Sequence, residues 1–230
     1  MNNKTNPNHV AIILDGNRRF AKKLVLEPWK GHELGAGKVE KLLDWASEIG
    51  IKELTLYVLS VENLESRPKN ELEYLFKLFR KEFRNLSKEK IEKNKIKIRF
   101  IGNLSLLPAD LAEQCKKLEA KTEKNNNFII NFCLAYGGRQ ELVEAVKKII
   151  SNKVQAEEIS EKTIEKNLYM QSQPDLIIRT GGEKRTSNFL PWQSTYSEWF
   201  FLDKMWPEFE KQDLVGAIEN FKLRKRNFGA

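Results

Sequence analysis

Side chains suited to phosphate chemistry follow the first apolar run of the sequence. That run leads to Asp15, and Gly16, Asn17, Arg18 and Arg19 come directly after it. The glycine permits close backbone approach, Asn17 can cap a helix that begins near Arg18, and the helix end and Arg19 together suit a diphosphate. Asp15 would be repelled by that diphosphate unless a cation such as Mg²⁺ lay between them. For this motif alone, a capped strand-to-helix turn on the surface would be the better explanation.

A second set of phosphate-binding side chains lies in the string IIRTGGEKRTSNF. Arg179, Arg185 and Ser187 surround a loop that contains Gly181 and Gly182. Two arginines, a hydroxyl group and glycine backbone amides together suit a second diphosphate. The glycine spacing matches neither a Walker A loop nor the GxGxxG fingerprint. A surface hairpin with incidental charges is a weaker explanation here than for the first motif.

Other candidates are single polar side chains whose role depends on their neighbours. Glu62 and Asn63 follow the second apolar run, Arg67 comes shortly afterwards, and His32 lies in the string KGHELG. A lone histidine or asparagine is more often structural than catalytic. Glu198 lies in the aromatic string WQSTYSEWFF, and its position alone does not predict metal binding.

Apolar runs rich in branched residues alternate with stretches of helical spacing. The runs predict strands, which are expected at 9–14, 53–60, 96–102, 128–136 and 175–180. Apolar residues three and four positions apart predict helices over 39–49 and 72–83. This alternation predicts a mostly parallel sheet covered on both faces, and ligands of such sheets bind outside the carboxyl ends of the strands.

Helix boundaries are marked by proline, asparagine and glycine. Starts are predicted at Lys69 or Asn70, near Pro108 and at Gly138. Ends are predicted at Gly50 and Asn94. Each stretch between these signals is long enough to cross from one parallel strand to the next.

Composition narrows the class of protein. The 230 residues, 40% hydrophobic and 31% charged, are those of a globular chain, and no linker divides them, so one domain over 1–230 with a short flexible N-terminus at about 1–8 is expected. The formal net charge of +8 suits an anionic partner, although most lysines lie in mixed-sign stretches. Cys115 and Cys133 lack zinc-site spacing. With no signal sequence or spanning segment evident, a cytoplasmic protein is expected.

From about His9 to Gly229 the chain resembles the cis-prenyltransferases, the undecaprenyl and dehydrodolichyl diphosphate synthases. The strings that carry the resemblance are HVAIILDGNRRFAKK, GHELG, LTLYVLSVEN, NFCLAYGGRQE, DLIIRTGGEKRTSNFLPWQSTYSEWFF and WPEF. The resemblance implies a single α/β domain with an open, mainly parallel six-stranded sheet, about seven flanking helices and a hydrophobic tunnel, distinct from a Rossmann fold. It also implies a homodimer.

The resemblance also implies roles for individual residues. Asp15 matches the essential aspartate that helps to hold Mg²⁺, Glu198 matches a second magnesium ligand, and Asn63 matches an asparagine implicated in catalysis. The allylic diphosphate site is matched by Gly16, Asn17, Arg18, Arg19 and Phe20. The isopentenyl diphosphate site is matched by Arg179, Arg185 and Ser187. His32 matches the histidine of a GH motif, and Arg67 falls near a substrate arginine.

The implied activity is condensation of isopentenyl diphosphate with farnesyl or geranylgeranyl diphosphate to a Z-polyprenyl diphosphate that serves as a lipid carrier of glycans. Such a product is compatible with an association at the membrane surface. Three positions depart from the family pattern: Leu64 replaces an aromatic residue, EPWK ending at Lys30 replaces an arginine, and Asn227 stands in the C-terminal motif, where Arg224 or Arg226 would have to compensate. The preferred primer and the product length do not follow from the sequence.

Three other classes of protein fit less well. A trans-prenyltransferase would need DDxxD motifs, which the sequence lacks. A noncatalytic partner subunit would not retain both Asp15 and Glu198. A nucleic-acid-binding protein would show a basic face with exposed aromatic residues, whereas the aromatic residues here lie in predicted strands and apolar helical faces.

Overall fold

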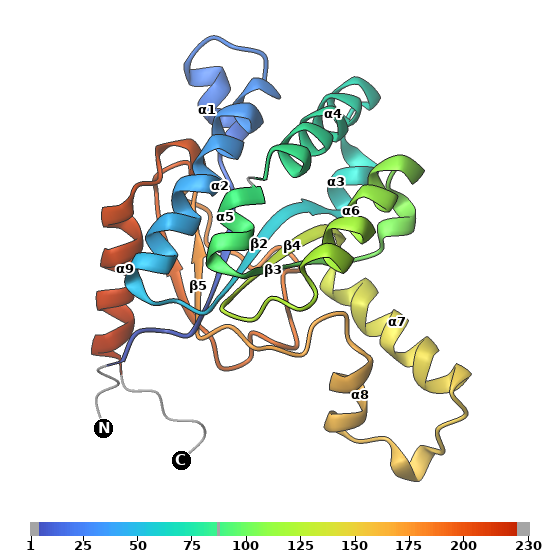
Figure 1. The fold of residues 1–230 in the computed structure, drawn as a ribbon. Coiled ribbons are helices and arrows are strands. Elements are labelled where there is room, and N and C mark those ends of the chain that lie inside the picture. The colour runs from blue at the N-terminus through green and yellow to red at the C-terminus, as the bar shows by residue number, and fades with distance from the viewer. Residues whose placement is uncertain (1–4, 87, 225–230) are drawn as a thin grey trace.

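A computed structural model describes residues 5–86 and 88–224 and shows six parallel strands in the order β3-β4-β2-β1-β5-β6 (Figure 1). The strands are β1 His9–Ile13, β2 Glu53–Ser60, β3 Ile96–Ile101, β4 Phe128–Tyr136, β5 Leu176–Arg179 and β6 Glu198–Phe201. Every neighbouring pair is parallel. The predicted single-domain α/β fold with an open six-stranded sheet is therefore confirmed.

Nine α-helices lie within these described residues, against about seven expected from the family resemblance. They are α1 Asn17–Lys23, α2 Lys30–Ile49, α3 Val61–Ser66, α4 Lys69–Asn85, α5 Lys88–Asn94, α6 Ala109–Thr122, α7 Gly138–Ser151, α8 Glu161–Asn167 and α9 Lys211–Leu223. Four of them (α1, α3, α5 and α8) are only 6 or 7 residues long. Three short 3-10 helices complete the list: η1 Leu104–Leu106, η2 Ala156–Glu158 and η3 Trp206–Glu208.

The predicted helix boundaries agree with local backbone geometry. Helix α2 ends at Ile49 because Gly50 follows in the left-handed region, at a φ of 87° that glycine adopts without steric cost. Pro68 and Pro108 directly precede the first residues of α4 and α6. These starts and ends, together with those at Gly138 and Asn94, are confirmed.

Alternation along the strands divides the core into two parts. In β1, Val10 and Ile12 pack into a large cluster with side chains of α2, α4, α5, α6 and α9, whereas Ala11 and Ile13 point to the other face. That second face is covered largely by the irregular segment after α8, including Met170, Phe189 and Leu190. The sheet is thus covered on both faces, but only the first face has a thick helical layer.

The N-terminal residues expected to be flexible are partly held in place. The Asn6 side chain donates a hydrogen bond to the Ile49 carbonyl at 2.7 Å, and the Asn8 backbone N–H donates to Asp175 at 2.9 Å. The Asn8 carbonyl also accepts hydrogen bonds from Lys52 and Glu53. In residues 5–86 and 88–224, no helix has the length and apolar character to cross a membrane.

Candidate active site

The two phosphate-binding motifs meet at the carboxyl edge of the sheet. Asp15 follows β1 and Arg179 ends β5, the neighbouring strand, so both side chains emerge at the same edge. Arg179 Nη2 donates to Asp15 Oδ2 at 2.8 Å, and Arg179 Nη1 donates to Ser187 Oγ at 2.7 Å. The Arg179 side chain is only 3% exposed. A buried guanidinium therefore links the Asp15 carboxylate to the second motif.

Two further arginines, Arg19 and Arg185, lie near this pair and are more exposed than Arg179. Arg19 Nη2 lies 3.4 Å from Asp15 Oδ1, and Arg19 Nη1 lies 3.6 Å from Glu183 Oε1. Arg185 Nη1 donates to Glu183 Oε2 at 2.6 Å, and its side chain is 60% exposed. Because exposed ion pairs of this kind are worth little, an incoming phosphate can replace Glu183 as the partner of both arginines. Sequence reasoning missed Glu183.

The predicted role of the Gly181 and Gly182 amides is wrong. The backbone amides of Gly181 and Gly182 are not available to a diphosphate, because they donate to the carbonyls of Lys204 and Leu202. The glycines serve space and conformation instead: Gly181 has a φ of 87°, and a Cβ there would lie 2.7 Å from Arg19 Nη2. These two amides instead bond the loop to the segment that follows β6.

Asn17 does not cap α1 but is its first residue, preceded by Gly16 with a φ of 102°. Its Nδ2 donates to the Leu14 carbonyl at 2.9 Å. Its buried Oδ1 has no hydrogen-bond partner and faces α2, where a Cβ on Gly35 would lie only 2.3 Å away. Gly35, the second glycine of the GHELG string, therefore leaves room for Oδ1 of the Asn17 side chain beside the cavity.

A second polar group gathers beside α3. The Ser60 hydroxyl accepts the Asn63 N–H and caps this helix, which turns Asn63 toward the site. Arg67 Nη2 donates to Asn63 Oδ1 at 3.2 Å, and Arg67 Nη1 lies 3.3 Å from His32 Nε2. The structure thus brings Arg67, Asn63 and His32 together, despite the departure from the family pattern near Leu64.

The environment of His32 disfavours a charged ring. Burial, reinforced by the positive charges of Arg67 and Arg18, lowers the pKa of His32 to about 3. The neutral ring can then accept a hydrogen bond from Arg67 at Nε2. Glu71 Oε1 lies 3.4 Å from the same Arg67 Nη1, and Glu71 Oε2 lies 3.6 Å from Arg18 Nη2. Glu71 is a buried acid in the first turn of α4, and no sequence signal distinguished it.

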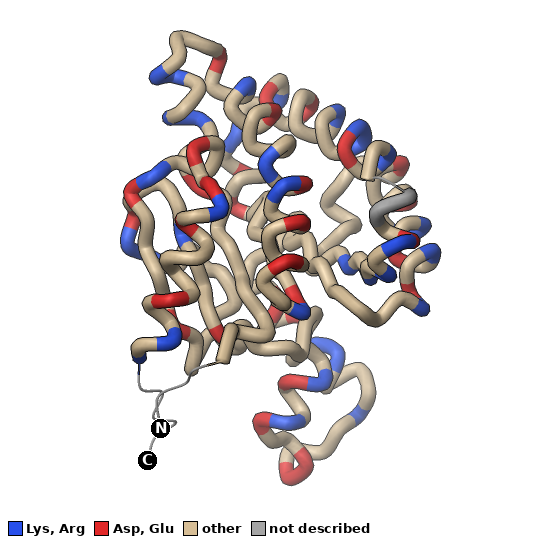
Figure 2. The backbone as a smooth tube through the Cα atoms, turned by 60° about the vertical axis from the view of Figure 1, so that its left-hand side comes forward, with Lys and Arg blue, Asp and Glu red and all other residues tan. Residues whose placement is uncertain are grey.

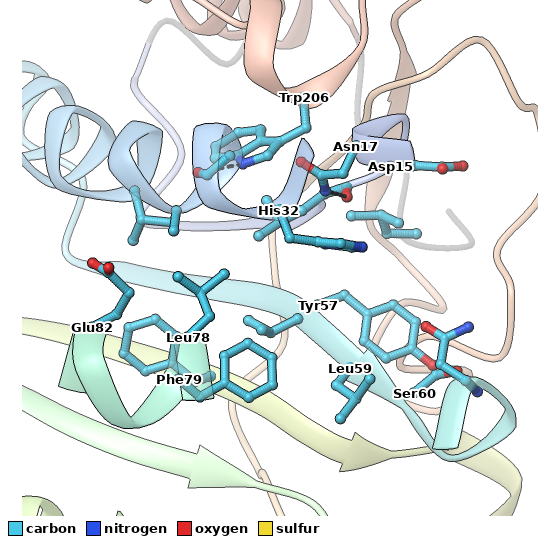
Figure 3. A pocket seen from close by; sticks show the side chains of 18 of the residues that line it. Asp15, Asn17, His32, Tyr57, Leu59, Ser60, Leu78, Phe79, Glu82 and Trp206 are labelled. Atoms are coloured by element: carbon cyan, nitrogen blue, oxygen red, sulfur yellow. Dashed lines mark hydrogen bonds between the residues drawn. The ribbon is translucent and has the colours of Figure 1, made fainter. Parts of the chain in front are cut away.

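These polar groups border a cavity of about 480 Å³ between the sheet, α2 and α4 (Figure 3). The predicted site residues in its lining are Asp15, Asn17, His32, Asn63, Arg67, Arg179, Arg185 and Ser187. Its apolar lining includes Val39 of α2 and Leu78, Phe79 and Phe83 of α4, and the last two belong to the apolar face predicted for the helix over 72–83. Figure 3 shows Asp15 at one end and Glu82 at the other. The cavity joins a charged end to an apolar passage.

Tyr57 of β2 lies where the two parts of the cavity meet. Its hydroxyl donates to the Tyr136 carbonyl at 3.3 Å or to the Ser187 carbonyl at 3.4 Å, and its ring stacks on Phe189 at 4.6 Å. Burial, with the nearby Glu62 charge, raises the pKa of Tyr57, so the hydroxyl stays protonated. The sequence did not identify this residue, because a tyrosine inside an apolar strand is normally part of the hydrophobic core.

Five predicted residues lie outside the cavity lining: Gly16, Arg18, Arg19, Phe20 and Glu198. Gly16 packs against Met205, because a Cβ there would lie 2.8 Å from the Met205 Cβ. Arg18 is directed to Glu71, and Phe20 is half-buried on α1. Only the Asn17 side chain of the helix motif lines the cavity.

Glu198 is not brought to Asp15 within this chain. Glu198 opens β6 in register with Leu176, whereas Arg179 pairs with Phe201 three residues further on, about 10 Å along the strand. Its carboxylate accepts from Arg224 at 2.6 Å. The two acids lie toward opposite edges of a parallel sheet, so they cannot ligate one ion in one chain. Asn227 and Arg226 lie outside the described residues.

The residues present nevertheless fit a magnesium ion that arrives with a substrate. No group of three or more His, Cys, Asp or Glu side chains suited to a metal occurs in residues 5–86 and 88–224. Mg²⁺ commonly takes one or two carboxylates and completes its shell with phosphate oxygens and water. Asp15 offers such a carboxylate, 28% exposed at the charged end of the cavity.

The parallel sheet, the arginine-rich edge and the adjoining apolar passage suit a ligand with an anionic head and an apolar tail. Comparison with known proteins makes this specific. The family described as "Putative undecaprenyl diphosphate synthase" matches residues 13–229. The chain therefore belongs to the undecaprenyl diphosphate synthase family of cis-prenyltransferases, and it is a prenyl-group transferase.

Relatives and solved structures agree with this assignment. The chain is 47% identical to a tritrans,polycis-undecaprenyl-diphosphate synthase (geranylgeranyl-diphosphate specific) of Methanopyrus kandleri, over 97% of this chain and 84% of that protein. It is 46% identical to an enzyme of the same name from Pyrococcus horikoshii, over 97% and 87%. The crystal structure of Lavandula x intermedia lavandulyl diphosphate synthase with dimethylallyl diphosphate is 34% identical, with a TM-score of 0.92 over 98% of this chain and 99% of that chain.

Proposed function

We propose that this cis-prenyltransferase condenses isopentenyl diphosphate with geranylgeranyl diphosphate and extends the chain to an undecaprenyl-length Z-polyprenyl diphosphate. The observation that carries the proposal is the single cavity that joins the Asp15 and Arg179 edge to an apolar passage along α4. The names of the relatives from Methanopyrus kandleri and Pyrococcus horikoshii support this primer and product. They favour geranylgeranyl over farnesyl diphosphate, between which the sequence did not choose.

We assign the two diphosphates to the two motifs. The allylic diphosphate lies at the start of α1, where Asp15, Arg19 and the unpaired amides of the first turn meet. Its hydrocarbon tail extends into the passage beside Phe79 and Phe83. Isopentenyl diphosphate lies against Arg185 and Ser187, with Arg179 between the two sites. Arg179 can then contact both diphosphates.

The residues act mainly through charge and alignment. Magnesium, when bound at Asp15, neutralises charge on the leaving diphosphate. Arg19 and Arg179 also stabilise the charge that develops on that diphosphate as the allylic carbon becomes cationic. Asn63, held by Arg67, orients the isopentenyl group so that its double bond faces the allylic carbon. Loss of a proton from the adduct completes the Z double bond.

A homodimer is part of the proposal. Helices α7 and α8 project from the body of the molecule (Figure 1), and α7 exposes an apolar stripe of Val143, Val146 and Ile150 at helical spacing. Such a stripe on a projecting helix favours a partner protein. Light scattering should report a dimer that Ile150→Glu converts to a monomer. Val215→Glu, at an exposed apolar position on α9, is the matched control and should leave the dimer intact.

The biological setting is also a proposal. The product serves as a lipid carrier of glycans, and the enzyme works in the cytoplasm at the membrane surface, where a long polyprenyl chain can leave water. Rescue of cells depleted of their own undecaprenyl diphosphate synthase tests the carrier role. Growth without restored glycan assembly would contradict it.

The direct test is incubation of the purified protein with Mg²⁺, labelled isopentenyl diphosphate and, in parallel, farnesyl or geranylgeranyl diphosphate. Chain-length and double-bond analysis should find a Z-polyprenyl product formed faster from geranylgeranyl diphosphate. A short branched product such as lavandulyl diphosphate, the compound named for the structural relative, would contradict chain extension. Absence of product from folded, dimeric protein with any primer would overturn the proposal.

A further inference from the structure

The connection between α1 and α2 exposes apolar side chains that the fold leaves uncovered. Leu24, Val25 and Leu26 follow α1 directly and are 48%, 94% and 44% exposed. Three consecutive large apolar residues at such exposure form a contiguous patch, which differs from the isolated exposed leucines of ordinary surfaces. The connection lies at the outer end of its helices, away from the sheet (Figure 1).

Val25 is unfavourable at this position for two reasons: its apolar side chain is exposed and its backbone conformation is strained. Helix α1 ends in a Schellman motif, because the Leu26 N–H donates to the Ala21 carbonyl at 2.9 Å and the Val25 N–H donates to the Lys22 carbonyl at 3.0 Å. The residue directly after the C-cap of such a motif is usually glycine. Val25 occupies it with a φ of 56°, a left-handed conformation that a β-branched residue adopts only with strain. A bulky apolar side chain is therefore presented to solvent where glycine would be easier.

The charges within the connection itself are mainly positive. Residues 22–30 contain three lysines, Lys22, Lys23 and Lys30, against the single acid Glu27. Figure 2 shows blue positions on both sides of this connection, at the upper left. Lys23 lies 3.1 Å from Glu208 and Lys30 lies 3.5 Å from Glu33, both exposed pairs that an anionic surface can replace.

The base of the connection is held in place. The ring of Trp29 lies 6.5 Å from the ring of Tyr74 on α4, which ties the connection to the helix that lines the cavity. Tyr74 also donates to Glu33 at 2.7 Å. An apolar tip on a fixed base, with lysines beside it, has the composition of interfacial membrane anchors.

We propose that residues 22–30, here called the α1–α2 loop, dock the enzyme on an anionic lipid bilayer, with Leu24, Val25 and Leu26 inserted among the acyl chains. This inference deepens the membrane-surface location within the proposed function by naming the surface and the lipid charge. A second copy of the chain is a poorer occupant of the patch, because it would bring like lysines together. The loop extends α1, so docking places the diphosphate edge of the sheet near the lipid.

The test is co-sedimentation of the full-length protein with vesicles of equal parts phosphatidylglycerol and phosphatidylcholine, and with vesicles of pure phosphatidylcholine. Wild-type protein should bind the anionic vesicles more tightly. Val25→Asn removes one inserted side chain and suits the left-handed backbone, so it should bind about tenfold or more weakly without loss of fold. Lys22→Glu reverses one charge and should weaken binding to anionic vesicles by at least about fivefold.

The matched control is Ile159→Asn, at an apolar position with 47% exposure outside the loop, which should bind as wild type does. Binding of the wild type to neither vesicle, or equal binding by Val25→Asn and wild type, would overturn the proposal. A changed oligomeric state of Val25→Asn without lipid would instead make the patch a protein interface and also overturn it. Vesicle binding is measured without substrate, so its failure leaves the condensation reaction intact.

Discussion

Buried polar side chains form short hydrogen bonds at both the amino and the carboxyl edge of the parallel sheet, but their surroundings differ. At the amino edge, His9, Thr55 and Asn131 are buried and bond to one another: His9 Nε2 lies 2.7 Å from Thr55 Oγ1, and Asn131 Nδ2 donates to Thr55 Oγ1 at 2.8 Å. At the carboxyl edge, Asp15 and Arg179 form an equally short pair, but that pair faces a cavity. The first arrangement is a structural network and the second is a site.

The two histidines of the chain show why the cavity, and not titration, distinguishes these edges. Burial lowers the pKa of His9 at the amino edge and of His32 at the carboxyl edge. Perturbed titration is a recognised signal of functional sites, yet here it occurs equally in a closed network. What separates the two is that His32 lines the cavity and contacts Arg67, which also lines it.

The largest effect that separates the edges should follow from Asp15→Asn. The amide oxygen still accepts from Arg179, so the folded structure survives, but the negative charge that balances a metal ion and orients Arg179 is lost. Turnover with saturating substrates should fall about 10²- to 10³-fold. Steady-state kinetics and circular dichroism measure the two quantities. Near-normal turnover would remove Asp15 from the reaction.

Thr55→Val at the amino edge should give the opposite pattern. The change keeps the shape of the side chain but leaves His9 Nε2 and Asn131 Nδ2 short of a buried partner. We expect the free energy of unfolding to fall by about 1–3 kcal/mol, with unchanged kcat and KM. Thr195→Val, at an exposed threonine, is the control and should stay within about 0.5 kcal/mol of the wild type. A kinetic defect in folded Thr55→Val would break the distinction between the edges.

Local patterns in the sequence predicted the frame on which both edges are built. Branched apolar runs gave strands such as β2 and β4 with their observed limits, and prolines and glycines placed the ends of α2, α4 and α6. The sequence also placed Asp15 and Arg179 at the carboxyl ends of parallel strands, where ligands bind. It did not predict that their strands are neighbours.

What the sequence did not predict depends on contacts between distant segments. The amides of Gly181 and Gly182 are engaged because the segment after β6 returns beside them, and Glu71 meets Arg67 only through the packing of α4. Glu198 was matched to a magnesium ligand by resemblance, yet its place at the first residue of a parallel strand puts it toward the amino edge. Motif position alone does not give these distances.

A smaller effect should separate two neighbouring cations at the carboxyl edge. Arg185→Ala removes an exposed guanidinium that lines the cavity, so the KM for isopentenyl diphosphate should rise about tenfold with little change in stability. Lys184→Ala removes an adjacent exposed charge that is not among the lining residues and is the matched control. Equal KM values for the two variants would show that Arg185 supplies only general positive charge.

The smallest effect concerns His32 and its dependence on pH. Because the pKa of folded His32 is lowered to about 3 while an unfolded histidine titrates near 6.5, the folded protein takes up this proton only in strong acid. The stability contributed by neutral His32 is complete above about pH 6.5 and is lost progressively as the pH falls toward 3, since only the unfolded state is protonated in that window.

His32→Gln should therefore show a shallower loss of unfolding free energy on acidification than the wild type, with His9 unchanged in both proteins. NMR titration should also find the wild-type His32 ring neutral at about pH 5, where an ordinary histidine is charged. Protonation of His32 near its ordinary pKa would mean that the ring does not accept from Arg67. Arg67 would then be positioned by Glu71 and Asn63. His32 would be a group at the carboxyl edge that changes its charge near neutral pH.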